Sequence, residues 1–499
     1  MTPRTSLIAV AIGRVAQVGY VWSLSRLATH TLGPEGMGRM NLVLSVYACA
    51  IFLLVSPVAN FFNRHALEWQ MDGTLRKNFN RYTAFLGAVA AATAVALLIV
   101  QSTIGTGIEI NTIWLLCLVT GSVFFNQLNG LCAHLMNIMG HRIWYVTLIN
   151  LSSWLGIGAA LAITRARGAS AEYWLCGLLA GQILVLCLAL PIVRLNFVRP
   201  EQLLTPGNGT QPFEFSSVLA FSSPLIVSTC FYWIHISGYR FALRNMTDEA
   251  TVGLFTVGIG MAMAPMSILD ALFSEYYSPI FLREIAGADK RQIADAFSRY
   301  TSAYFPVIVL ACACIAVSGT FLARLMVSKE FYTVGNLALW GALLQGAIML
   351  NSSFSNLIFA SRDTRVSIIP SVCGAASAIA GVVLLAKWDP LPGSGIALFA
   401  AMALTVCVTG RKLRRSFPFQ LPFRRLGLSC VLAAPIVAGG IALQFLFPNP
   451  TTVQSLGALS TLGAYTAFAQ YLMSREWISQ PGRKDDAAVV PLAASVSAS

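Results

Sequence analysis

The chain is poor in charged residues. Of its 499 residues only 11% are Asp, Glu, Lys or Arg, and the acidic ones number only 20. A typical soluble domain has about 25% charged residues. Here 56% of the residues are hydrophobic and the mean hydropathy is +0.70. Such a composition cannot supply a polar surface, so it excludes a soluble globular protein and predicts a chain whose solvent is the lipid bilayer.

Motifs for catalysis and cofactors are also lacking. The eleven cysteines have no metal-ligand spacing, since Cys312 and Cys314 lie within one apolar segment and the others are scattered. They are typical of small packing residues. There is no nucleotide-binding glycine motif, no catalytic triad pattern, and no stretch between apolar segments long enough for a soluble catalytic domain. We therefore expect no metal, no cofactor and no enzymatic activity.

What the chain has is a long series of apolar segments. A transmembrane helix needs roughly 20 mainly apolar residues, and fourteen segments approach or exceed that length. The sequence thus predicts an all-α polytopic membrane protein with about fourteen transmembrane helices. The expected spans are 6–29, 40–62, 82–101, 111–138, 143–164, 172–194, 216–238, 250–280, 300–322, 334–360, 366–386, 393–410, 426–447 and 453–473.

The basic residues indicate how these segments thread the membrane. With the N-terminus inside, most of the 33 Lys and Arg residues fall in cytoplasmic connections. Short cytoplasmic loops are enriched in Lys and Arg, so both termini are predicted to be cytoplasmic. The net charge of +13 is then explained by topology and by contact with anionic lipid headgroups. We expect membrane lipids, and no nucleic acid, as partners.

A short motif occurs twice and indicates internal doubling. Phe79-Asn80-Arg81-Tyr82-Thr83 returns as Phe297-Ser298-Arg299-Tyr300-Thr301. The offset matches one six-helix unit, and an even number of helices gives parallel repeats about an axis along the membrane normal. The predicted organisation is an N-lobe over 1–195, a linker over 196–215, a C-lobe over 216–411, two further helices over 412–474, and a cytoplasmic tail over 475–499.

Polar side chains inside apolar segments are the candidates for function, because burying them in a membrane is unfavourable. Arg14 lies midway along the first segment, with Gln17 one turn later. A guanidinium there suits a phosphate, since its planar fork binds two oxygens at once. Asn60 and Arg64 lie near the cytoplasmic end of the second segment, where a cavity role and a topological role are both open.

Further candidates lie in later segments. The fourth carries Asn126, Asn129 and His134 along polar faces, which need either neighbouring helices or a wet cavity as partners. Arg240 closes the seventh segment. Asp270 and Glu275 lie in the eighth segment, where carboxylates could balance arginines or bind a coupling proton or sodium ion.

Two loops resemble those of a known family. Arg26-x5-Leu32-Gly33-Pro34-Glu35-Gly36-x-Gly38 joins the first two helices, and Tyr239-Arg240 with Ala250-Thr251-Val252-Gly253-Leu254-Phe255 joins the seventh to the eighth. Both resemble polysaccharide flippases of the multidrug/oligosaccharidyl-lipid/polysaccharide exporter superfamily, including its Wzx-type and xanthan-type exopolysaccharide flippases. The two additional C-terminal helices resemble the fourteen-helix lipid II flippases of that superfamily.

The resemblance implies V-shaped lobes around a cationic cavity, in a bacterial inner-membrane protein. Its implied activity is alternating-access translocation of an undecaprenyl-diphosphate-linked oligosaccharide for exopolysaccharide or O-antigen synthesis, with a polysaccharide polymerase and export machinery as partners. Lipid II flipping and a MATE-type drug or cation antiporter are the alternatives. A membrane polysaccharide polymerase or ligase is a third possibility, but the predicted external loops are too short for it.

Overall fold

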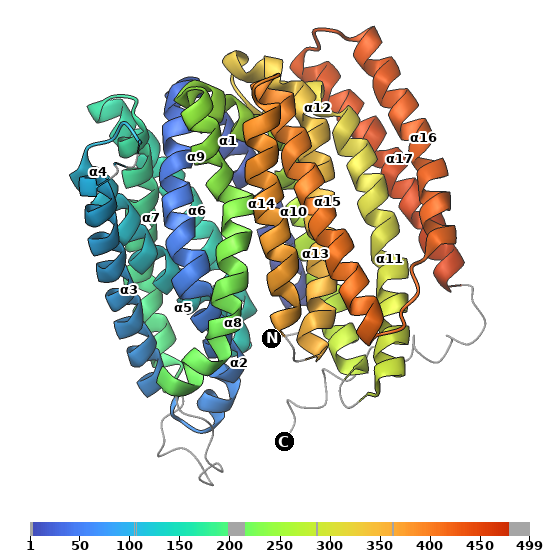
Figure 1. Cartoon of the computed structure of the whole chain (residues 1–499). Coiled ribbons are helices and arrows are strands. Elements are labelled where there is room, and N and C mark those ends of the chain that lie inside the picture. The colour runs from blue at the N-terminus through green and yellow to red at the C-terminus, as the bar shows by residue number, and fades with distance from the viewer. Residues whose placement is uncertain are drawn as a thin grey trace.

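The structure is a computed structural model that describes residues 3–103, 105, 107–197, 215–285, 288–361 and 364–478. Across these residues the chain is helical and contains no strand. The first half of the chain forms α1 (Pro3–Ala50), α2 (Ser56–Met71), α3 (Leu75–Thr103), α4 (Thr112–Gly121), α5 (Gln127–Ile138), α6 (Arg142–Arg167) and α7 (Ala171–Leu195). The helices stand side by side as one bundle (Figure 1).

The second half repeats this arrangement and then continues. It forms α8 (Phe215–Trp233), α9 (Tyr239–Met246), α10 (Glu249–Glu284), α11 (Lys290–Val317), α12 (Gly319–Met326), α13 (Ala338–Ser361), α14 (Ile368–Leu385) and α15 (Pro390–Ser416), followed by α16 (Phe423–Leu446) and α17 (Thr452–Ile478). Single π-helical turns η1 (Ile51–Val55), η2 (Ser122–Asn126) and η4 (Ile234–Gly238) join α1 to α2, α4 to α5 and α8 to α9. The 3₁₀ turns η5 (Lys329–Leu337) and η6 (Thr364–Ser367) precede α13 and α14.

Helix α1 contains two spans rather than one. Gly33 has a φ of 64° and a ψ of −176°, which interrupts the helix directly before Pro34. A positive φ is a conformation that glycine adopts without steric penalty, and proline at the next position starts the second span. The sequence motif between the first two predicted spans is therefore a sharp kink.

The predicted span count agrees with the structure. With α1 divided at Gly33 and helices joined by π turns counted together, the described residues form fourteen long helical runs plus the short α12. Each run overlaps one predicted span. Eleven candidate spans in the described residues are long and apolar enough to cross a membrane, the α1–α2 run counting as one of them.

Equivalent aromatic contacts support the internal repeat. Phe79 packs against Phe197 at 5.5 Å between ring centroids, and its counterpart Phe297 packs against Phe419 at 5.0 Å. One turn later, Tyr82 lies 4.9 Å from Phe62. In the second half, Tyr300 lies 5.5 Å from Phe281 in the same way. The repeated motif thus anchors the third helix of each half to that half's second helix.

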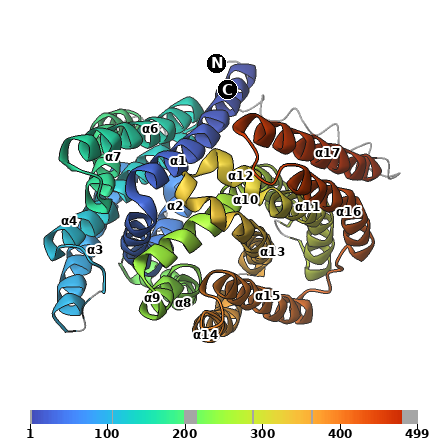
Figure 2. The ribbon, with the colours of Figure 1, turned by 90° about the horizontal axis from the view of Figure 1, so that it is seen from above.

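The two halves meet along α1 and α10. Viewed from above, these helices run through the middle of the bundle, with α3, α4, α6 and α7 on one side and α11, α16 and α17 on the other (Figure 2). Helices α16 and α17 pack on α11 and α12, outside the doubled unit. The predicted lobe boundaries stay predictions, since most of the 196–215 linker and of the 475–499 tail lies outside the described residues.

We use two names for the ends of the bundle. The proximal end is where α1 begins and α17 ends, and the distal end carries the Gly33 kink and the start of α10 (Figure 1). The sequence predicts that the proximal end is cytoplasmic.

Candidate functional site

The seam between the halves is closest at a pair of glycines near the distal end. A Cβ on Gly38 would overlap the carbonyl oxygen of Glu249, and a Cβ on Gly253 would overlap the carbonyl oxygen of Pro34. The two contacts are reciprocal, because residues 34 and 38 of the first half align with 249 and 253 of the second. The backbones of α1 and α10 therefore cross in direct contact. The internal repeat exchanges the two glycine contacts at this crossing.

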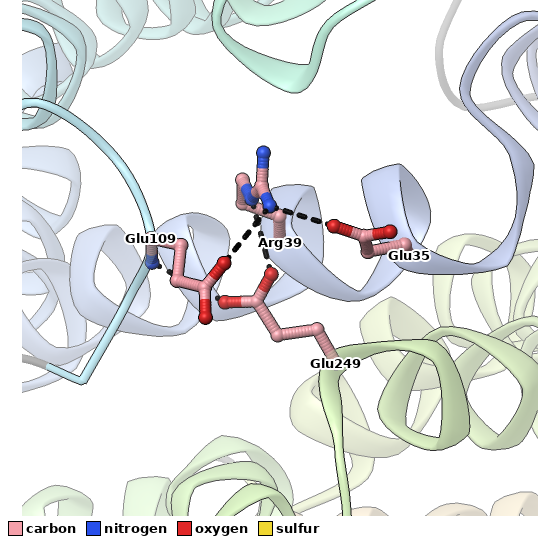
Figure 3. A network of polar contacts seen from close by, with 4 residues as sticks. All are labelled: Glu35, Arg39, Glu109 and Glu249. Atoms are coloured by element: carbon pink, nitrogen blue, oxygen red, sulfur yellow. Dashed lines mark hydrogen bonds and ion pairs between the residues drawn. The ribbon is translucent and has the colours of Figure 1, made fainter.

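An ion-pair cluster lies beside this crossing (Figure 3). Arg39 Nε donates to Glu249 Oε2 at 3.0 Å, and Arg39 Nη2 lies 2.9 Å from Glu35 and 3.6 Å from Glu109. The backbone N–H of Glu109 donates to the other oxygen of Glu249 at 3.3 Å. Glu249 is only 6% exposed. A buried carboxylate of the second half is thus held by two segments of the first.

These three carboxylates are also the group in the described residues whose oxygens lie close enough to share a cation. The guanidinium of Arg39 already contacts all three. A metal ion would have to displace that arginine, so the cluster is a cross-half ion pair in this structure.

A second arginine lies deeper in the bundle. Arg240, on α9, donates through Nη1 to Ser45 Oγ at 2.9 Å and to the carbonyl oxygen of Asn41 at 3.3 Å, both on α1. Its Nε is buried without a hydrogen-bond partner. Trp233 Nε1 also donates to the carbonyl oxygen of Ser45, at 2.9 Å. With 1.5 Å of rise per residue, Ser45 is about 9 Å below Arg39.

Arg240 differs from Arg39 in having only neutral partners. Among the described residues, no carboxylate forms an ion pair with Arg240. An uncompensated cation inside a membrane protein is unfavourable. The site therefore favours an anion near Arg240.

The polar residues of the fourth span separate into different environments. Asn126 and Gln127 both donate to the hydroxyl of Tyr47 on α1, at 3.3 Å and 2.7 Å. Asn129 is buried and donates to Gln182 on α7 at 2.5 Å. His134 is exposed, with its ring 5.9 Å from that of Tyr145. The polar residues of this span therefore do not form one continuous face.

The π-helical turn η2 explains the difference. It adds a residue to one turn just before α5, and a residue added to a helix rotates the following side chains by about 100°. Asn126 thus faces α1 while Asn129 faces α7. The role of Asn129 in substrate binding stays a prediction, and its observed contact is between neighbouring helices.

The residues of the second span lie near its proximal end. Asn60 and Arg64 are exposed on α2. Phe62, between them, packs on Tyr82, which directly follows the basic residue Arg81. Arg64 therefore lies level with the start of the third span, at the boundary of the predicted membrane rather than at its centre.

The remaining candidates are distributed over both halves. Gln17 is half-buried on α1. Asp270 accepts a hydrogen bond from Tyr304 of α11, within the second half. The side chains of Arg14 and Glu275 lie outside what the structure describes, so their roles stay predictions.

A cavity lies between the doubled unit and the two additional helices. It has a volume of about 350 Å³ and opens between α10, α11, α16 and α17. Its walls are mainly apolar and aromatic, and they include Phe273, Tyr277, Pro306, Leu310 and Tyr471. Arg425 and Gln470 supply polar groups. An apolar chain carrying a polar end fits such a lining.

Comparisons with known proteins identify the fold. No protein-family model matches the chain, and no curated protein sequence matches it. The lipid II flippase MurJ in an inward closed conformation superposes with a TM-score of 0.61 at 13% identity, covering 95% of this chain and 99% of that one. An inward-facing multidrug resistance MATE family transporter of the MOP superfamily has a TM-score of 0.56 at 13% identity, covering 82% and 98%.

A eukaryotic MATE transporter has a TM-score of 0.52 at 10% identity, covering 92% of this chain and 97% of that one. The chain therefore has the fold shared by MurJ and the MATE transporters, and it is a multi-pass membrane protein. These similar structures are transporters and flippases rather than enzymes.

Sequence reasoning missed Arg39, Glu249, Ser45 and Tyr47. A signal for the first two was available. Arg39 directly follows one of the aligned glycines, and Glu249 precedes the other by one helical turn. Opposite charges beside two aligned glycines indicate that the motifs meet in space.

Proposed function

We propose that the protein is a flippase that moves an undecaprenyl-diphosphate-linked oligosaccharide across a bacterial inner membrane by alternating access, for exopolysaccharide or O-antigen synthesis. Its termini would be cytoplasmic, and a polysaccharide polymerase with export machinery would use the product. The fold, common to MurJ and the MATE transporters, supports a transporter in which two halves rock about a central seam.

The observation that carries the choice of substrate is Arg240. It lies between α9 and α1, and within the described part of the chain it donates to Ser45 and to a backbone carbonyl and has a buried Nε without a partner. Burying a diphosphate away from water without counter-charge is prohibitive. The unpartnered Nε–H of a guanidinium can donate to a phosphate oxygen, and the positive charge of the group strengthens that bond. Arg14 and Arg64 are proposed to assist from the proximal side.

Neutral polar groups suit the rest of the head group. The amides of Asn126 and Gln127 donate to the hydroxyl of Tyr47, which lies on α1 two residues after Ser45. Amides and hydroxyls can exchange hydrogen bonds with sugar hydroxyls without adding charge. We propose that the polyprenyl tail stays in lipid.

A cation exporter is the second candidate, and Asp270 favours it. A carboxylate inside a membrane helix suits a cationic drug or a coupling ion. However, Asp270 accepts its hydrogen bond from Tyr304 within the second half. The described acidic residues at the seam are occupied by Arg39. Lipid II remains an alternative substrate with the same diphosphate chemistry.

The test compares Arg240→Gln and Arg240→Lys in proteoliposomes that contain an undecaprenyl-diphosphate-linked oligosaccharide. Flipped lipid is measured by an external glycosidase that cannot cross the membrane. Loss of a charge-assisted contact to phosphate is expected to slow flipping by about tenfold or more in Arg240→Gln, with partial recovery in Arg240→Lys. Arg165→Gln, which removes an exposed arginine at the end of α6, is the matched control.

Two results would contradict the proposal. One is equal flipping by the Arg240→Gln variant and the parent protein at equal reconstituted amounts. The other is export of a cationic dye that depends on Asp270, with no flipping of the lipid-linked sugar, which would favour the second candidate.

A further inference from the structure

The two halves are joined at the distal end by a contact that only one copy of the repeat carries. Glu249 aligns with Pro34, and Arg39 aligns with Leu254. The Arg39–Glu249 ion pair therefore has no counterpart on the other side of the Gly38–Gly253 crossing. The backbone contact is symmetric and the ion pair is not. The symmetric backbone contact is a point about which the halves can turn, whereas the asymmetric ion pair holds the halves in one position.

Both oxygens of Glu249 are used by the first half. Oε2 accepts from Arg39 Nε at 3.0 Å, and Oε1 accepts from the Glu109 backbone at 3.3 Å. Glu109 lies in the connection between α3 and α4, whereas Arg39 lies on α1. The start of α10 is thus bound to two separate segments across the seam, and separating the halves here would break both bonds.

The burial of Glu249 makes this separation unfavourable without a replacement partner. A carboxylate that loses its cation while it stays buried is strongly destabilised. Glu35 and Glu109 are exposed and lie on the first half with Arg39. When the halves part, they would keep the guanidinium on that side and leave Glu249 alone.

We propose that Arg39 and Glu249 form the distal latch of the transport cycle, which holds the seam closed at this end and breaks when the seam opens there. This inference rests on the alternating access proposed above. The latch is a conformational device and does not contact the substrate. Glu35 and Glu109 retain Arg39 when the latch is open.

The test measures access to the seam from the distal side. The reporter is Thr256→Cys in a chain whose eleven native cysteines are replaced. Thr256 lies seven residues after Glu249 on the same face of α10 and is buried. Labelling by a membrane-impermeant maleimide is followed in vesicles of both orientations. Glu249→Gln, which keeps the size of the side chain but removes its charge and one of its two accepting oxygens, is expected to speed distal labelling about tenfold or more.

Matched variants separate the latch from a general loss of structure. Arg39→Gln should behave like Glu249→Gln, and Arg39→Lys should label at nearly the parent rate. Arg299→Gln breaks the exposed 2.7 Å ion pair with Glu284 inside the second half and should leave labelling unchanged. If Glu249→Gln does not elute as a folded protein in size-exclusion chromatography, the Arg39→Gln variant decides the test, because Arg39 is only half-buried.

The proposal is overturned if folded Arg39→Gln and Glu249→Gln proteins both label at the parent rate. Because the label needs no substrate, this result is independent of the flipping assay. If Arg240→Gln flips the lipid at the parent rate while the latch variants label faster, the proposed substrate is overturned and the latch is supported.

Discussion

Because α1 and α10 cross in direct contact, we predict that Gly253→Ala is less stable than Gly260→Ala, although both glycines lie on α10. A Cβ on Gly253 would overlap the Pro34 carbonyl oxygen and lie 2.8 Å from the backbone nitrogen of Gly38. Both are backbone atoms of a helix, so no side chain can rotate away to make room. A Cβ on Gly260, two turns further along α10, would meet no atom within 4 Å.

The expected magnitudes follow from two terms. Replacing glycine by alanine inside a helix stabilises it by about 1 kcal/mol, and this gain applies to both positions. Overpacking at Gly253 opposes it by about 1–3 kcal/mol. Gly260→Ala should therefore be neutral or stabilised. The free energy of unfolding of the Gly253→Ala variant should be about 1–3 kcal/mol lower than that of the Gly260→Ala variant, because only the overpacking term differs between them.

The measurement is chemical unfolding of both purified variants in the same detergent micelle, with Gly38→Ala as a second test from the partner helix. Gly38→Ala meets the Glu249 carbonyl oxygen and should match Gly253→Ala. Equal stability of the Gly253→Ala and Gly260→Ala variants would refute the direct backbone contact on which the crossing and the latch both rest.

Two further predictions concern single hydrogen bonds. Removing the Asn129 amide leaves the half-buried Gln182 without its donor, so Asn129→Ala should lower the free energy of unfolding by about 0.5–1.5 kcal/mol, and the Asn129→Leu/Gln182→Leu pair should recover part of it in the same unfolding assay. The Thr251 backbone N–H donates to Asp248 and lowers the pKa of that carboxyl below its usual 3.8. Its stabilisation of the start of α10 should be complete above about pH 4 and fall as the pH drops through the lowered pKa, whereas Asp248→Asn should remove that pH dependence of the melting temperature.

The spans and their order could be predicted from the sequence because apolar length alone determines them. The repeat could also be predicted, since Phe79 and Phe297 are large buried aromatics whose loss would leave cavities in both halves. Short elements were harder. No residue pattern marks the π turn at 122–126 in the sequence, yet this turn separates Asn126 from Asn129 on the helix surface.

The candidate site was only partly accessible to the same reasoning. Arg240 was found because it is a charge near an apolar segment. Ser45 and Tyr47 were missed because a single hydroxyl in an apolar run is unremarkable until a neighbouring helix places a donor beside it. Arg39 was missed, because ion pairs between residues 210 positions apart cannot be read from local patterns.

The position of the α1–α10 crossing gives the bundle unequal lever arms. From Gly253, α10 continues for about 46 Å to Glu284 but extends only about 6 Å back to Glu249, at 1.5 Å per residue. A rigid rotation of about 10° about this fulcrum would move the proximal tip by about 8 Å and the distal tip by about 1 Å. An ångström is enough to break a hydrogen bond but too little to admit a sugar. Distal opening therefore requires the Gly38–Gly253 contact between α1 and α10 to separate as well.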